Sequence, residues 1–119
     1  MQIHTEKYCE LCGNCLLVHV PRELDHHEAG QLRQEVDGMI NAGHVRQLVF
    51  DFSRTEFMDS SGIGVMIGRC RAMGYHGGEV IARNLSSRLE KIFLASGLHK
   101  LIQTEQPGQN HTQKGNGEK

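Results

Sequence analysis

Two spacings of apolar residues alternate along the chain, one typical of strands and one typical of helices. Residues 15–20 (CLLVHV) form a short apolar run rich in strand-forming residues, and the Gly-Asn dipeptide before it is typical of a hairpin turn. Residues 1–12 are therefore expected to supply the other arm of a hairpin. Residues 47–52 (QLVFDF) predict a buried strand at the centre of the sheet, because the run is short and rich in Val and Phe. Residues 79–82 predict a further short strand.

Three helices are predicted from apolar residues at helical spacing. Asp25 is expected to cap the first helix and Gly43 to end it. The inward positions of this helix are Ala29, Leu32, Val36, Met39 and Ile40. The second is expected to begin at residues 60–61 and to bury one stripe: Ile63, Met66, Ile67, Cys70 and Met73. The third covers residues 86–95, with Gly97 as its stop.

Strands that alternate with helices after an initial hairpin predict an α/β fold. We expect one domain over residues 1–106, with a mixed sheet of four or five strands and helices mainly on one face. Leu101 and Ile102 are expected to close a last short strand or helix. Residues 107–119 contain no aliphatic side chain, so they predict a disordered polar tail, because such a segment cannot offset its ordering entropy.

Composition excludes several kinds of partner. The chain has 13 Lys and Arg residues against 14 Asp and Glu residues, so it lacks the net positive charge that draws a protein to nucleic acid or to anionic lipid. We expect no direct nucleic-acid partner and no membrane partner. The apolar runs are too short to cross a bilayer and the N-terminus lacks a secretion leader, so we expect a cytoplasmic protein with thiols rather than disulfides.

Three of the cysteines, Cys9, Cys12 and Cys15, are spaced C-x2-C-x2-C. This spacing occurs in iron–sulfur and zinc loops, and His4 or His19 would be the fourth ligand. The bacterial cluster motif needs a fourth cysteine followed by proline, which this sequence lacks. The alternative is a set of thiols on a hairpin, with Cys12 opposite Cys15. We favour this alternative, and we expect no metal and no cofactor.

The residues DSSG at 59–62 place two hydroxyls at a strand-to-helix turn. Unpaired backbone N–H groups and the positive end of a helix dipole gather at such a turn and accommodate a phosphate. Alternatively, Ser60 or Ser61 simply caps the helix, and local chemistry does not decide between the two. Asp25 and Asp59 are not expected to act as a catalytic acid and base, since carboxylates are common at helix starts. Ser60 also lacks the GxSxG frame of a hydrolase.

Four segments carry a resemblance to a known family. They are ELDHH at 23–27, FMDSSGIGVMIGR at 57–69, GGE at 77–79 and SGLHK at 96–100. Together they resemble the anti-sigma factor antagonists, in particular the sporulation antagonists, which are STAS-domain proteins. The resemblance extends from about residue 15 to residue 106. It implies a small mixed sheet with helices on one side, in agreement with the apolar pattern.

The resemblance also implies a mechanism, in which the chain is not an enzyme. In the family, the first serine after the aspartate is phosphorylated by an anti-sigma factor that is also a serine kinase, and this position is Ser60. Only the unphosphorylated form binds the anti-sigma factor and frees the sigma factor. A serine phosphatase restores that form. By the same alignment Asp25, Asp59, Ser61 and Gly62 would lie on the docking surface for the kinase.

Overall fold

The computed structural model describes residues 7–75 and 77–105. Five of its strands are β1 (Cys9–Cys12), β2 (Cys15–His19), β4 (Gln47–Asp51), β6 (Glu79–Arg83) and β7 (Gln103–Glu105). They form a mixed sheet with the strand order β1-β2-β4-β6-β7. β1 is antiparallel to β2, and the other neighbouring strands are parallel. β4 is the central strand, as the sequence predicts.

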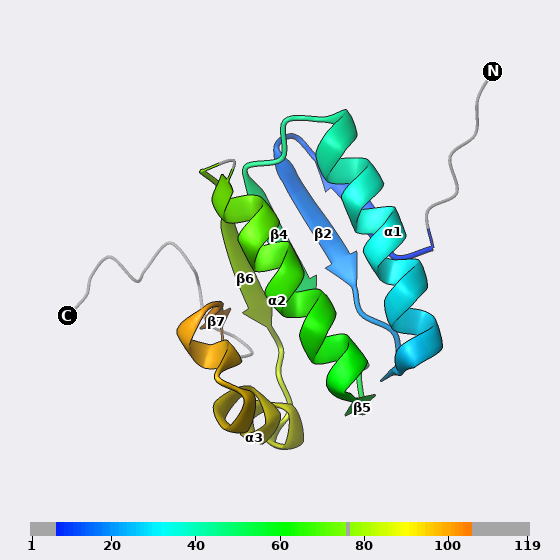
Figure 1. Cartoon of the computed structure of the whole chain (residues 1–119), viewed down its shortest axis with the longest axis vertical. Coiled ribbons are helices and arrows are strands. Elements are labelled where there is room, and N and C mark those ends of the chain that lie inside the picture. Colours follow the sequence, from blue (N-terminus) through cyan, green and yellow to red (C-terminus); the bar gives the residue numbers. More distant parts are fainter. Residues whose placement is uncertain (1–6, 76, 106–119) are drawn as a thin grey trace.

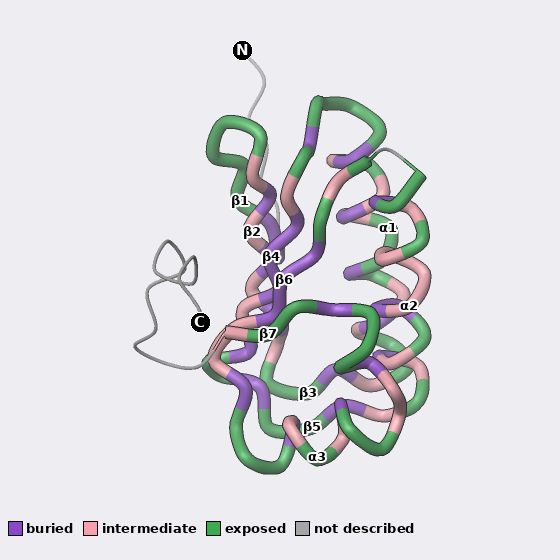
Figure 2. The backbone as a smooth tube through the Cα atoms, turned by 90° about the vertical axis from the view of Figure 1, so that its left-hand side faces the viewer, coloured by how far each residue is buried: buried purple, intermediate pink, exposed green. Residues whose placement is uncertain are grey.

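The helices lie mainly on one face of this sheet, as expected. α1 (His26–Ala42) and α2 (Ser60–Tyr75) run side by side across that face, and α3 (Ser87–Ser96) lies near one end of the sheet (Figure 1). Seen from the side, the strands and the pair of long helices form two layers (Figure 2). The left-handed backbone of Gly97, with φ of 85°, ends α3 as predicted.

The core fills the space between the two layers. Leu16 and Val18 of β2 and Phe50 of β4 are fully buried there, together with Met66 and Met73 of the predicted α2 stripe. The intervening strand residues point to the opposite face, which α1 and α2 do not cover. We call this the outer face of the sheet.

Two features of the fold differ from the sequence prediction. A small second sheet, in which β3 (Glu23–Leu24) pairs in parallel with β5 (Phe57–Met58), is not predicted. Leu101 and Ile102 belong to neither a strand nor a helix. They link a short 3-10 helix, η1 (Leu98–Lys100), to β7. The side chain of Ile102 is buried and is part of the hydrophobic core. Residues 1–6 of the expected hairpin arm and the expected polar tail at 107–119 lie outside the described residues.

Candidate functional site

The small β3–β5 sheet brings the starts of two helices together. Leu24 and Met58 are register partners in the parallel β3–β5 sheet. The residues that follow them, Asp25 and Asp59, therefore both lie at the carboxyl ends of these two strands. The backbone N–H of Asp59 also donates a hydrogen bond to the carbonyl of Leu24 over 3.4 Å. α1 and α2 therefore begin beside each other, at the same end of the molecule (Figure 1).

An aspartate caps each of these helices. The Asp25 carboxylate accepts a hydrogen bond from the Glu28 backbone N–H over 3.0 Å, as predicted. The Asp59 carboxylate accepts hydrogen bonds from the backbone N–H groups of Ser61 and Gly62, over 2.8 and 3.3 Å. The interpretation that a serine caps α2 is therefore wrong, because a carboxylate occupies the cap and both hydroxyls are left for other contacts.

The two serines of the motif have different surroundings. Ser60 is exposed, and its hydroxyl has no hydrogen-bond partner among residues 7–75 and 77–105. Ser61 is half-buried, and its Oγ lies 3.2 Å from Nδ1 of His26, the first residue of α1. No sequence pattern indicates this contact, since it joins residues that are far apart in the chain. A macromolecule that approaches this edge thus meets a free hydroxyl at Ser60.

Gly62 lies beneath the site rather than on its surface. A Cβ atom at this position would come within 2.5 Å of Cγ of Met58 and 2.9 Å of Cδ2 of Leu24. The missing side chain thus lets the first turn of α2 pack directly on the β3–β5 pair. This contact fixes the position of Asp59 and Ser60 relative to α1.

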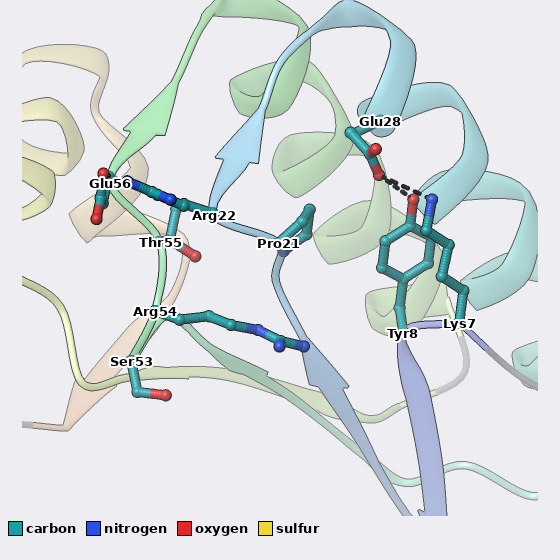
Figure 3. Close-up of a pocket in the computed structure, with 9 residues that line it drawn as sticks. All are labelled: Lys7, Tyr8, Pro21, Arg22, Glu28, Ser53, Arg54, Thr55 and Glu56. Atoms are coloured by element: carbon teal, nitrogen blue, oxygen red, sulfur yellow. Dashed lines mark hydrogen bonds and ion pairs between the residues drawn. The ribbon is translucent and has the colours of Figure 1, made fainter.

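A hollow of about 770 Å³ flanks the β3–β5 pair (Figure 3). Most of its charges are matched: Arg22 and Glu56 form an ion pair of 3.1 Å, and Lys7 and Glu28 form one of 3.5 Å. Arg54 extends across the hollow, and no carboxylate of the described residues pairs with it. Within residues 7–75 and 77–105, Arg54 therefore gives this side of the site a positive charge without an ion-pair partner.

The cysteine trio does not gather at one point. Cys12 and Cys15 are register partners in the β1–β2 hairpin, as expected. Cys9 is buried and pairs with Val18, so it points to the helix-covered face. Over the described residues, no three Cys, His, Asp or Glu side chains form a group that could hold a metal ion. Within the same residues, no helix has the length and apolar content needed to span a membrane.

Comparison with known proteins identifies the family. Residues 10–113 match the STAS domain, so the chain belongs to the STAS domain family. It is 32% identical to the anti-sigma F factor antagonist of Paenibacillus polymyxa, over 73% of this chain and 74% of the relative. Within the STAS family it therefore groups with the anti-sigma factor antagonists, which are regulatory proteins rather than enzymes.

Solved structures agree with this grouping. The anti-sigma factor antagonist SpoIIAA in its unphosphorylated form is 33% identical and superposes with a TM-score of 0.74, over 82% of this chain and 85% of SpoIIAA. The Bacillus cell fate determinant SpoIIAA in its phosphorylated form, also 33% identical, gives a TM-score of 0.68 over 82% of this chain and 88% of that chain. The STAS fold expected from the sequence is thus confirmed.

Proposed function

We propose that the unphosphorylated chain binds an anti-sigma factor that is also a serine kinase, and that this binding releases a sigma factor. The kinase phosphorylates Ser60, which ends the binding, and a serine phosphatase resets the switch. The observation that carries this proposal is the difference between the serines: the Ser60 hydroxyl is exposed and unbonded within the described part of the chain, whereas Ser61 contacts His26. The existence of a relative in phosphorylated and unphosphorylated forms supports it.

The proposed docking surface is built around Ser60. Asp59 comes directly before Ser60 and caps α2, Asp25 caps the neighbouring start of α1, and Ser61 lies on the next position of α2. Gly62 contributes from below, by holding the first turn of α2 against the β3–β5 pair. A partner that docks here would contact both helix starts at once.

The same geometry explains why phosphate would act as a switch without unfolding the domain. Ser60 is the first residue of α2, at the positive end of the helix dipole, which favours an anion although the Asp59 carboxylate already accepts the backbone N–H groups of Ser61 and Gly62. A phosphoserine nevertheless adds about −1.5 to −2 charges beside Asp59, on a surface that must be desolvated when the kinase docks. The domain would tolerate this charge, but the interface would not.

The similarity to anti-sigma F factor antagonists supports a role in transcription regulation during sporulation. We place this role in the cytoplasm, without a direct nucleic-acid or membrane partner. An enzyme would behave differently, because it would turn over a substrate without a partner protein.

Incubation with ATP tests the proposal. The purified chain should stay unmodified with ATP alone and should gain one phosphate when its anti-sigma factor kinase is added. Phosphopeptide mapping should place the phosphate on Ser60, and the matched variant Ser61→Ala should still be phosphorylated. Phosphate on Ser61, or turnover of ATP by the chain alone, would contradict the proposal.

A further inference from the structure

We propose that Cys12 and Cys15 form a reversible dithiol–disulfide site at the tip of the β1–β2 hairpin, which low-molecular-weight disulfides oxidise. The two residues are register partners on either side of the two-residue turn made by Gly13 and Asn14. Gly13 has a φ of 61°, the left-handed backbone that such a turn requires. This proposal does not depend on the function proposed for Ser60.

The pairing geometry suits a disulfide. Directly opposed residues of antiparallel strands have Cα atoms about 4.5 to 5.5 Å apart and side chains on the same face of the sheet. A disulfide requires Cα atoms about 4.4 to 6.8 Å apart. The Cα spacing therefore allows a bond between Cys12 and Cys15 without a change of register. Because Cβ atoms of opposed residues lie about 4.5 to 5.5 Å apart and a disulfide needs about 3.5 to 4.5 Å, the bond would draw the two strands slightly together at the hairpin tip.

The hairpin tip is also held in place. The carbonyl of Asn14 accepts hydrogen bonds from the backbone N–H groups of Arg46 and Gln47, over 2.8 and 3.2 Å. These bonds fix the turn against the start of β4. The two sulfur atoms are thus kept near each other before any bond forms, which favours the intramolecular bond over one between two chains.

The other two cysteines are not positioned to compete. Cys9 is buried and points to the helix-covered face of the sheet. Side chains alternate between the two faces along a strand, so Cys15 lies with Leu17 on the outer face. Cys12 lies on the same face, because it is the register partner of Cys15. Cys70 is half-buried on α2, in the helix layer. Cys12 and Cys15 are therefore the pair of described thiols that can combine.

The different exposure of the two thiols sets the order of the reaction. Cys12 is exposed, whereas Cys15 is half-buried and burial raises the pKa of its thiol. The Cys12 thiolate attacks an external disulfide RSSR, so that a Cys12–S–S–R bond forms and one thiolate RS⁻ leaves. Cys15 then loses its proton and attacks the Cys12 sulfur, which forms the Cys12–Cys15 bond and expels the second RS⁻. Two electrons pass from the cysteine pair to RSSR, which is reduced to two thiols.

The site lies far from Ser60. β2 begins at Cys15 and runs away from the hairpin turn, toward the end of the sheet where β3, β5 and the start of α2 lie (Figure 1). Oxidation would therefore alter the opposite end of the molecule and leave the caps at Asp25 and Asp59 unchanged.

Equilibration of the full chain in mixtures of oxidised and reduced glutathione tests the proposal. After alkylation of the remaining thiols, mass spectrometry should show Cys12 and Cys15 lost together, as one internal bond. Cys15→Ser should accumulate glutathione on Cys12. Cys12→Ser should form no internal bond. The matched control Cys70→Ser should behave like the parent chain.

Three results would overturn the proposal. The first is a parent chain whose dithiol stays reduced in oxidised glutathione alone. The second is a stable glutathione adduct on Cys12 of the parent chain, because Cys15 would then fail to resolve it. The third is a bond that involves Cys9 or a second copy of the chain, which peptide mapping and non-reducing electrophoresis would reveal.

Discussion

The Oγ of Ser61 lies 3.2 Å from Nδ1 of His26, across the gap between the first turns of α2 and α1. This contact occupies one hydroxyl of the Ser-Ser pair and leaves the other, at Ser60, exposed. If the contact restrains Ser61, His26→Ala should free that hydroxyl. We then expect a minor share of phosphate on Ser61 after treatment with the kinase, while Ser60 remains the main site. Phosphopeptide mapping measures this share, and an unchanged distribution would show that the contact does not select the serine.

Substitutions at Ser60 should separate binding from switching. Ser60→Ala should bind the anti-sigma factor and resist silencing, whereas Ser60→Asp should bind poorly. An unpaired charge left at a docked interface costs about 2 to 5 kcal/mol, and each 1.4 kcal/mol is about a tenfold change in affinity. A phosphorylated chain should therefore bind tens to thousands of times more weakly. Titration calorimetry of both forms measures the difference, and equal affinities would refute the switch.

Gly62 should tolerate no side chain, in contrast to Gly64 two positions along. Gly62→Ala would force its Cβ against Met58 and Leu24, so we expect a loss of about 1 to 3 kcal/mol in the free energy of unfolding. Gly64→Ala is the matched control, because a Cβ at Gly64 would have no neighbour within 4 Å and alanine favours a helix by about 0.5 to 1 kcal/mol. Urea unfolding of both variants should show changes of opposite sign.

A charge at Met66 should unfold the domain. Met66 is fully buried between α2 and the sheet. An isolated buried charge costs several kcal/mol, which approaches the whole stability of a small domain. Met66→Asp should therefore lose its cooperative thermal transition, whereas Met66→Leu should melt close to the parent chain. A normal melt for the aspartate variant would mean that the side chain reaches solvent.

The Asp37–Arg69 pair should matter for the packing of α1 on α2. Arg69 is largely buried and donates to the Asp37 carboxylate. Asp37→Ala would leave the guanidinium partly unsatisfied and should cost about 1 to 3 kcal/mol of unfolding free energy. Asp37→Asn keeps a hydrogen-bond acceptor and should cost less. Equal losses in the two variants would show that the charge, rather than the hydrogen bond, is what counts.

Local patterns are sufficient to predict the main elements of the fold. The helical stripe that contains Met66, the cap at Asp25 and the stop at Gly97 are each encoded within a few residues, so they are visible in the sequence alone. The central position of β4 follows from its continuous apolar character. The resemblance to the anti-sigma factor antagonists indicates the family, which the apolar pattern by itself does not.

The features that the sequence does not predict depend on contacts between distant residues. β3 and β5 have two residues each, so no periodicity reveals them, and they exist because Leu24 and Met58 meet across the chain. The contact of His26 with Ser61 arises from the same pairing. A serine and an aspartate are equally good caps for α2, and Asp59 comes directly before the two serines. Which of these residues caps α2 depends on where its first turn begins, and the sequence alone does not show this.

The two edge strands of the sheet, β1 and β7, affect how well the molecule resists aggregation. An edge strand offers unpaired N–H and C=O groups that can recruit another chain, and natural proteins limit this hazard with short or charged edges. β1 has four residues and includes the exposed Glu10, and β7 has only three, all polar. The longer apolar strands β2, β4 and β6 are all interior. Over its described residues, the sheet thus offers little template for edge-to-edge growth.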